Sequence, residues 1–193
     1  MVGVARGLRR AVVLGLLAIV SPIAAHAQVT VSMATGQLLA NDGLSPGQFR
    51  WQPEAANATG TLSIVVSTSL QRAYVFRGAT LIGISTVSTG QPGYDTPAGR
   101  FPIMEKQVFH RSSLYDDAPM PFMQRLTVDG IALHAGPIPR SGEPVSHGCI
   151  RLPRAFAQRL YAMTAIGTVV LVTDATPETP EEALTLAMAN PGL

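Results

Sequence analysis

Apolar and polar residues alternate between residues 62 and 87, and this pattern predicts a meander of strands. The first run has alternating apolar residues on one face: Leu62, Ile64 and Val66. A second apolar run at 73–76 follows a short polar break, and Arg77-Gly78 supplies a turn before a third run at 81–87. A period of two residues is typical of strands. We therefore expect a mainly β fold.

Short strands and long loops are predicted for the middle of the chain. Residues 100–103 read as a strand between turn signals, whereas residues 110–124 show no period and predict a long loop. In residues 126–133, two apolar runs flank Asp129-Gly130. Because Asp-Gly adopts the positive φ angles of a two-residue turn, this segment predicts a hairpin.

The last third of the domain predicts one helix and a closing strand. Pro153 suits the first position of a helix. Apolar residues at spacings of four and three then share one face: Phe156, Leu160 and Met163. This spacing predicts about three helical turns that end at Gly167. Residues 168–172 are apolar and β-branched, so they read as a buried strand.

The length and composition favour one domain with two flanking segments. The 193 residues suit a single core, and 47% hydrophobic residues exclude general disorder. We assign residues 61–173 to the domain. Residues 28–60, rich in Ala, Gly, Asn and Pro, read as an irregular lead-in, and residues 174–193 as a tail with a short helix at 181–189.

The first 27 residues have the three parts of a secretory signal peptide. A basic stretch ends at Arg10, an apolar run covers 11–25, and a small-residue cleavage site occupies 25–27. Ser21-Pro22 interrupts the apolar run, which is shorter than the roughly 18–20 residues of a membrane-spanning helix. We expect export to the periplasm or cell wall, with cleavage after residue 27 favoured over a retained segment.

Removal of the signal peptide changes the meaning of the charge. It takes away three arginines and no acidic residue, so the net charge of +2 becomes −1. No basic footprint for nucleic acid then remains. Cys149 is the single cysteine, and an unpaired thiol in an oxidising compartment is an inert buried group, an intermolecular disulfide partner or a nucleophile.

Two histidines near Cys149 favour the nucleophile. A thiol attacks as the thiolate, whose ordinary pKa is about 8.5, so it needs a base. His134 ends a predicted strand upstream across a loop rich in Gly and Pro, and His147 is two positions away. In an extended segment the side chains at 147 and 149 share one side, and backbone N–H groups at Gly148 and Cys149 could hold an oxyanion. A catalytic thiolate would react well below pH 8.5.

The same stretch resembles the signature of the L,D-transpeptidase catalytic domain, also called the YkuD family. That signature is a histidine, a loop, Ser/Thr-His-Gly-Cys, a hydrophobic residue, and Asn or Arg. The matching positions are His134, Ser146, His147, Gly148, Cys149, Ile150 and Arg151. Segments 87–90, 96–101 and 120–122 also look like that family. The resemblance implies a YkuD-like β-sandwich with one short helix after the catalytic cysteine.

What the resemblance implies chemically is acyl transfer on peptidoglycan stems. Cys149 would attack the carbonyl of the third residue of a donor tetrapeptide, release D-Ala and form a thioester. An amine from a second stem, a D-amino acid or a wall-anchored protein would accept the acyl group. His134 would be the base, oriented by a backbone carbonyl at or near Ala135.

The remaining candidates surround this pair. His147 would shape the site and support the oxyanion with backbone donors at Gly148 and Cys149. Ser146 would hydrogen-bond the loop, and Arg151 would pair with a stem carboxylate or bridge to a nearby acid. Residues of the long loop that are candidates for a lid are Tyr115, Met120 and Phe122.

Other readings of the same residues stay open. A relative that uses water in the second step would be an L,D-carboxypeptidase or an amidase that releases wall-linked protein, and a non-catalytic module would only bind the wall. His134, His147 and Cys149 are zinc-ligand types, but paired cysteines and a fourth ligand are lacking. We expect no metal, and no nucleotide fingerprint indicates a cofactor.

Overall fold

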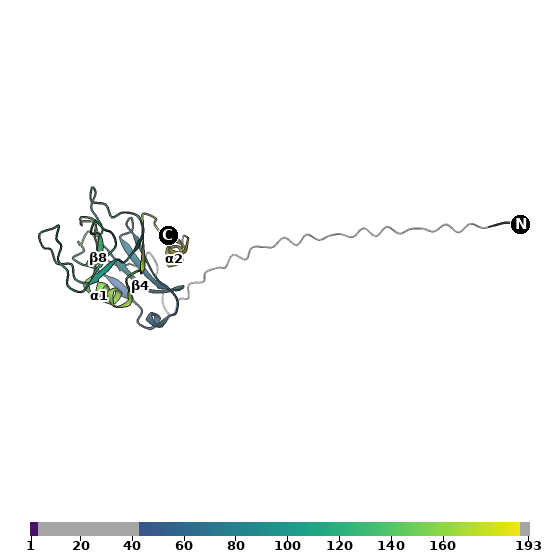
Figure 1. The fold of residues 1–193 in the computed structure, drawn as a ribbon, viewed down its shortest axis with the longest axis horizontal. Coiled ribbons are helices and arrows are strands. Elements are labelled where there is room, and N and C mark those ends of the chain that lie inside the picture. The colour runs from purple at the N-terminus through teal and green to yellow at the C-terminus, as the bar shows by residue number, and fades with distance from the viewer. Residues whose placement is uncertain (4–42, 190–193) are drawn as a thin grey trace.

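The strands within residues 1–3 and 43–189, which the computed structural model describes, pair into two sheets (Figure 1). The larger sheet has the order β1 (Phe49–Trp51), β4 (Thr80–Thr86), β3 (Arg72–Arg77), β2 (Leu62–Ser67), β10 (Val169–Thr173) and β5 (Gly99–Pro102). The smaller sheet has the order β6 (Glu105–Gln107), β7 (Met123–Arg125), β8 (Ala132–Ala135) and β9 (Ile150–Leu152). The mainly β fold class is confirmed.

The strand pairs are antiparallel except for two. β10 pairs with β2 in parallel, and β8 pairs with β9 in parallel. Apart from residues 1–3, the predicted signal peptide (1–27) and the predicted lead-in up to residue 42 lie outside the described residues.

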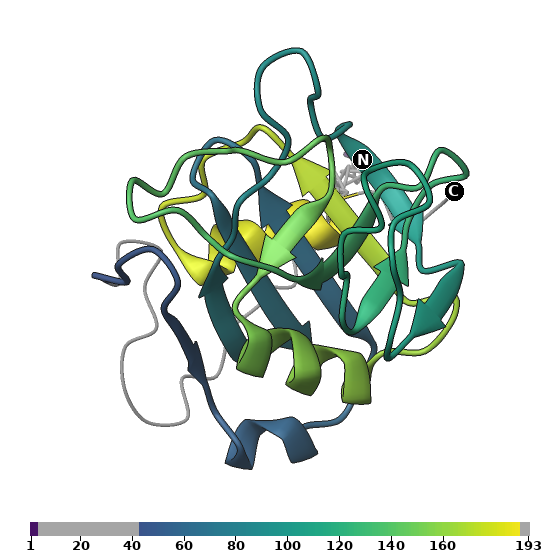
Figure 2. The same cartoon turned by 90° about the vertical axis from the view of Figure 1, so that its left-hand side faces the viewer.

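The core lies between the two sheets and against α1 (Arg154–Met163). Phe156 of α1 meets the rings of Phe49 and Trp51 edge-on, at centroid distances of 5.6 and 5.3 Å. Figure 2 shows this helix, in green, lying across the blue strands of the larger sheet. Burial of one helix face against the sheet explains the predicted spacing of apolar residues.

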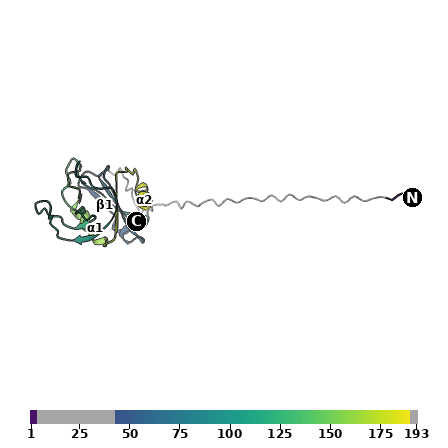
Figure 3. The ribbon, with the colours of Figure 1, turned by 45° about the horizontal axis from the view of Figure 1, so that its top comes forward.

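A second apolar cluster covers the other face of the larger sheet. Ala183 and Leu184 of α2 (Pro180–Met188) are buried there, against a set of strand residues that includes Val65, Tyr74, Phe76 and Ile84. Figure 3 shows α2 on the side of this sheet away from α1. Because both faces are covered, the strands are buried almost continuously along β3 and β4.

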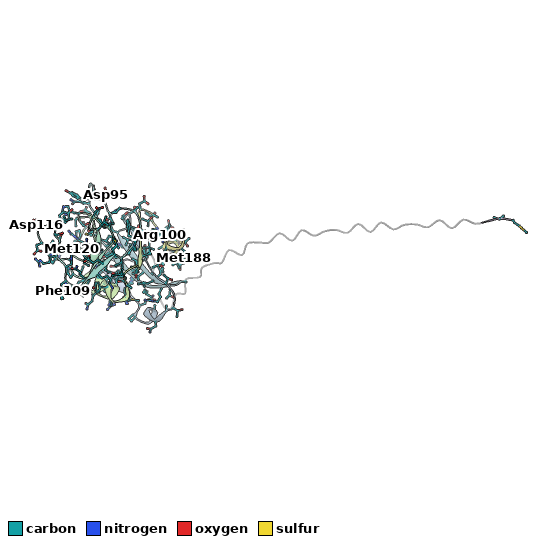
Figure 4. All side chains as sticks on the ribbon, in the orientation of Figure 1. Asp95, Arg100, Phe109, Asp116, Met120 and Met188 are labelled. Carbon is teal, nitrogen blue, oxygen red and sulfur yellow. The ribbon has the colours of Figure 1, made fainter. Side chains whose placement is uncertain are left out.

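Both ends of α2 are satisfied by hydrogen bonds. The Thr179 hydroxyl accepts from the Glu182 N–H at 3.2 Å. Arg100 of β5 donates through Nη2 to the carbonyls of Leu186 and Ala187, at 2.9 and 2.6 Å, in the last turn of the helix (Figure 4). The predicted helix at 181–189 is therefore an integral layer of the fold.

Three local predictions are wrong. Residues 49–51 of the expected irregular lead-in form β1, which pairs antiparallel with β4. The long loop predicted over 110–124 ends at β7, which begins at Met123. α1 ends at Met163 with Thr164 as its C-cap, and Gly167, at φ +87°, lies in the turn that follows.

The predicted hairpin is present, but its turn is different. The Gly130 N–H bonds to the Thr127 carbonyl at 3.2 Å, so Val128 and Asp129 are the central residues. Gly130 alone has a positive φ, of +96°, and Asp129 does not. The two-residue Asp-Gly turn is therefore wrong, because the turn is one residue longer and places its glycine after the bend.

Leu184→Ala is expected to lower the free energy of unfolding by about 2–5 kcal/mol. Leu184 is only 1% exposed in the second apolar cluster, between α2 and the larger sheet. Met188 on the same helix is 52% exposed, so Met188→Ala should change stability by less than about 0.5 kcal/mol. Urea unfolding followed by circular dichroism measures both. Equal values for the two variants would mean that α2 does not stabilise the sheet.

Candidate functional site

The parallel pairing of β8 with β9 brings together the two segments that carry the candidate residues. Leu133 pairs with Ile150, His134 with Arg151, and Ala135 with Leu152. Cys149 immediately precedes β9 and so lies beside the first residues of β8. The loop at 136–148 leaves the sheet where β8 ends and carries the chain back to the opposite end, where β8 begins.

His134 is buried in β8 and is held by its own strand. Its ring Nδ1 lies 2.9 Å from the carbonyl oxygen of Ala135, the predicted contact. Burial lowers the pKa of His134 to about 4; the Ala135 hydrogen bond acts against this shift, and the charge of Arg151 adds to it. The imidazole is therefore neutral near pH 7, and with Nδ1–H donating to Ala135, Nε2 keeps a lone pair that can take a proton.

Cys149 is half-buried and packs against Met120, Met123 and Ala132. Its Sγ lies 3.7 Å from the carbonyl oxygen of Gly130, to which the thiol donates. Burial raises the pKa of Cys149, while a backbone hydrogen bond with Ala132 and the charge of Arg151 act in the opposite direction. Burial thus favours a neutral thiol at rest, which departs from the thiolate expected well below pH 8.5.

The backbone before Cys149 is bent and hydrogen-bonded by Ser146. The Gly148 N–H donates to Ser146 Oγ at 3.1 Å, and that hydroxyl donates to the Cys149 carbonyl at 2.6 Å. Ser146 therefore bonds the loop, as expected. Because the Gly148 N–H is already used, its prediction as an oxyanion donor is wrong, and the Cys149 N–H is left as the donor of the predicted pair.

Gly148 could not be replaced by another residue without a shift in its surroundings. Its φ is +106°, and a Cβ built on it would clash with Cδ1 of Ile131. The same bend breaks the extended geometry from which His147 and Cys149 were predicted to share one side. Consequently His147 is exposed, whereas Cys149 is half-buried.

His147 lies in an exposed aromatic group beside the cysteine. Its ring stacks on Tyr115 at 4.4 Å with an interplanar angle of 14°, and meets Tyr94 edge-on at 4.5 Å. No sequence pattern singled out Tyr94, because it joins the site only through the folding of the 89–96 loop onto the Ser146 segment. This position suits a residue that shapes the entrance to the site.

Only one of the three lid candidates lies over the site. Tyr115 is exposed and covers His147. Met120 is 7% exposed and packs beneath Cys149. Phe122 packs against the core and lies 5.9 Å from the ring of Tyr161, so the lid assignments of Met120 and Phe122 are wrong.

A pocket of about 220 Å³ opens beside the cysteine. Its lining includes Ser112, Leu114 and Met120 from the long loop, Met123 from β7, and Gly130 from the hairpin turn. Met120, Met123 and Gly130 line the pocket and also contact Cys149, so these three residues separate the pocket from the thiol. Figure 4 places the long loop, marked by Phe109 and Asp116, at the end of the domain opposite Met188.

Arg151 is half-buried on β9 and has no acidic partner within residues 43–189. Its side chain lies close to Gly136, where a built Cβ would be 3.1 Å from Arg151 Cγ. The alternative of a bridge to a nearby acid is therefore not found, and the planar guanidinium can bind an incoming carboxylate.

Two features of the described residues concern metal binding and membrane insertion. No three His, Cys, Asp or Glu side chains there lie close enough together to hold a metal ion. Within the same residues, α1 and α2 both fall short of the length needed to span a bilayer.

Comparisons with known proteins agree on one family. Residues 62–172 match the YkuD family model, described as the L,D-transpeptidase catalytic domain. The probable L,D-transpeptidase 3 of Mycobacterium tuberculosis is 35% identical over 104 residues, which are 47% of this chain and 38% of that protein.

Solved structures show the same likeness. A crystal structure of an L,D-transpeptidase from Mycobacterium tuberculosis H37Rv is 28% identical with a TM-score of 0.55, over 58% of this chain and 57% of that one. The L,D-transpeptidase (Yku) of Stackebrandtia nassauensis is 28% identical with a TM-score of 0.55, over 67% of this chain and 62% of that one. The chain spans less than two thirds of the length of these relatives.

Alkylation of Cys149 by iodoacetamide is expected to rise with pH along a curve whose midpoint lies above that of the same chain unfolded in urea. Burial favours the neutral thiol over the thiolate, and Cys149 is the single cysteine, so the unfolded chain is a matched reference. Rates between about pH 6 and pH 10 give both midpoints. A native midpoint below the unfolded one would contradict the neutral resting thiol.

Proposed function

The chain belongs to the YkuD family of L,D-transpeptidase catalytic domains, and we propose that it transfers acyl groups between peptidoglycan stem peptides through a thioester on Cys149. The observation that carries this proposal is the placement of a neutral, oriented imidazole on β8 and of a half-buried thiol immediately before β9, the parallel partner of that strand. In this proposal, residues 61–173 are the catalytic domain. Residues 1–27 direct export to the periplasm or cell wall.

In the first step, Cys149 Sγ attacks the carbonyl carbon of the third residue of a donor tetrapeptide. The thiol proton passes to Nε2 of His134 as the S–C bond forms. Because burial disfavours both the imidazolium and the thiolate, proton transfer and attack proceed together. The C–N bond to D-Ala then breaks, and its nitrogen takes the proton from His134.

In the second step, an amine acceptor attacks the thioester carbonyl. His134 Nε2 takes a proton from the attacking nitrogen, the C–S bond breaks, and Cys149 regains a proton from His134. The product is an amide, and both protein groups return to their starting states. Water in place of the amine would give a carboxypeptidase or an amidase from the same thioester.

Each tetrahedral intermediate carries a negative oxygen that needs a hydrogen-bond donor. The N–H of Cys149 is the backbone donor that the bend at Gly148 leaves for this role, since the Gly148 N–H is held by Ser146. Arg151 lies two residues after Cys149 in the chain, and its guanidinium would bind a carboxylate of the stem peptide. His147, which stacks on Tyr115 and meets Tyr94 edge-on, would border the entry of the donor stem.

Cys149→Ala is expected to abolish the release of D-Ala from a tetrapeptide muropeptide, and Arg151→Ala to raise KM about tenfold to a hundredfold with a smaller change in kcat. The loss of a charge-assisted hydrogen bond of about 1.5–3 kcal/mol sets the size of the second effect. Mass spectrometry of the products gives D-Ala release, and also identifies the acceptor.

Arg159 provides a matched control for the removed charge. It lies on α1, with its guanidinium 5.6 Å from the ring centroid of Phe49, so Arg159→Ala should leave KM unchanged. Undiminished D-Ala release by Cys149→Ala would contradict the proposed nucleophile, and equal KM values for the two arginine variants would contradict the assignment of Arg151.

A further inference from the structure

A buried threonine links the cysteine segment to a loop on the other side of the site. Thr96 is 9% exposed, and its hydroxyl donates to the Gly148 carbonyl at 2.8 Å while accepting from the Gly90 N–H at 2.9 Å. A hydroxyl that donates and accepts at once has a fixed direction. The Gly148 carbonyl is therefore tied to the 89–96 loop, which itself pairs with the Ser146 segment.

The orientation of this carbonyl determines the orientation of the proposed oxyanion donor. The carbonyl of Gly148 and the N–H of Cys149 belong to one planar trans peptide, so they point in opposite directions. Holding the oxygen toward Thr96 therefore aims the Cys149 N–H the other way. We propose that Thr96 is a positioning residue that sets the direction of the Cys149 N–H and thereby the stabilisation of the oxyanion.

The two peptide planes around Cys149 are held by two different hydroxyls. Thr96 bonds the oxygen of the peptide before Cys149, and Ser146 bonds the oxygen of the peptide after it. Together they fix both backbone dihedral angles of the nucleophile. Such restraint is needed here because Gly148, without a Cβ, lets the preceding peptide rotate more freely than another residue would.

Loss of the Thr96 hydroxyl should have an effect that depends on the reaction. Acylation of Cys149 by p-nitrophenyl acetate passes through a tetrahedral oxyanion: the acetyl carbon bonds to Sγ, the thiol proton passes to Nε2 of His134, and the C–O bond breaks as p-nitrophenolate leaves. Alkylation by iodoacetamide displaces iodide at a saturated carbon and forms no oxyanion. A misdirected N–H therefore slows the first reaction and spares the second.

Thr86 is a matched control with the same bonding pattern elsewhere in the fold. It is 2% exposed, and its hydroxyl accepts from the Gly47 N–H at 2.9 Å and donates to the Gln48 carbonyl at 3.0 Å. Thr86→Val removes the two corresponding hydrogen bonds, one accepted and one donated, at the β1–β4 edge of the larger sheet. Its loss of stability should resemble that of Thr96→Val.

The experiment compares acylation and alkylation rates of the full chain and its variants. Thr96→Val should slow acylation by p-nitrophenyl acetate about ten- to a hundredfold and leave alkylation within about threefold of wild type. Thr96→Ser should restore acylation, and Thr86→Val should leave both rates unchanged. The melting temperature of each variant measures the common loss of stability.

Three results would overturn the proposal: acylation by Thr96→Val close to that of Thr86→Val, equal losses in acylation and alkylation, or no restoration by Thr96→Ser. The inference rests on Cys149 as the acyl acceptor in the proposed function, but the test does not require peptidoglycan. If wild type were acylated yet released no D-Ala from muropeptides, the transpeptidase proposal would fail and the role of Thr96 would still be decided.

Discussion

The parallel pairing of β8 with β9 is the constraint on which the candidate site depends. Its register sets His134 opposite Arg151, so the residue before β9, Cys149, lies beside the strand that carries the histidine. The core lies between this smaller sheet and the larger one, with α1 beside β8 and its Phe156 against Phe49 and Trp51 of β1. The site is therefore positioned by buried strand pairs, and its loops add the pocket and the exposed aromatic group.

Burial of His134 and Cys149, the two groups of the proposed mechanism, limits how they can act. The pKa of His134 is lowered to about 4 and that of Cys149 is raised, so a resting ion pair is disfavoured from both sides. A neutral pair needs proton transfer at the moment of attack, and this makes stabilisation of the oxyanion more important. The hydroxyls of Ser146 and Thr96, which hold the peptides on either side of the cysteine, then become part of the same chemical requirement.

Much of this architecture could be predicted because its strands and its first helix follow the spacing of apolar residues along the chain. The alternation at 62–87 and the apolar face of α1 gave the correct elements, and β8 and β9, which carry or adjoin the motif residues, pair with each other. The errors concern contacts between distant segments. The depth of Met120, the occupied N–H of Gly148 and the neutral thiol all depend on packing that no spacing along the chain reveals.

Rapid-quench mass spectrometry of the chain with a tetrapeptide donor tests the covalent mechanism most directly. The expected result is a mass increase equal to the donor minus D-Ala, located by peptide mapping on the fragment that contains Cys149. The covalent mechanism would be contradicted if D-Ala were released with no adduct on that fragment and if the rate of release were unchanged after complete alkylation of the thiol.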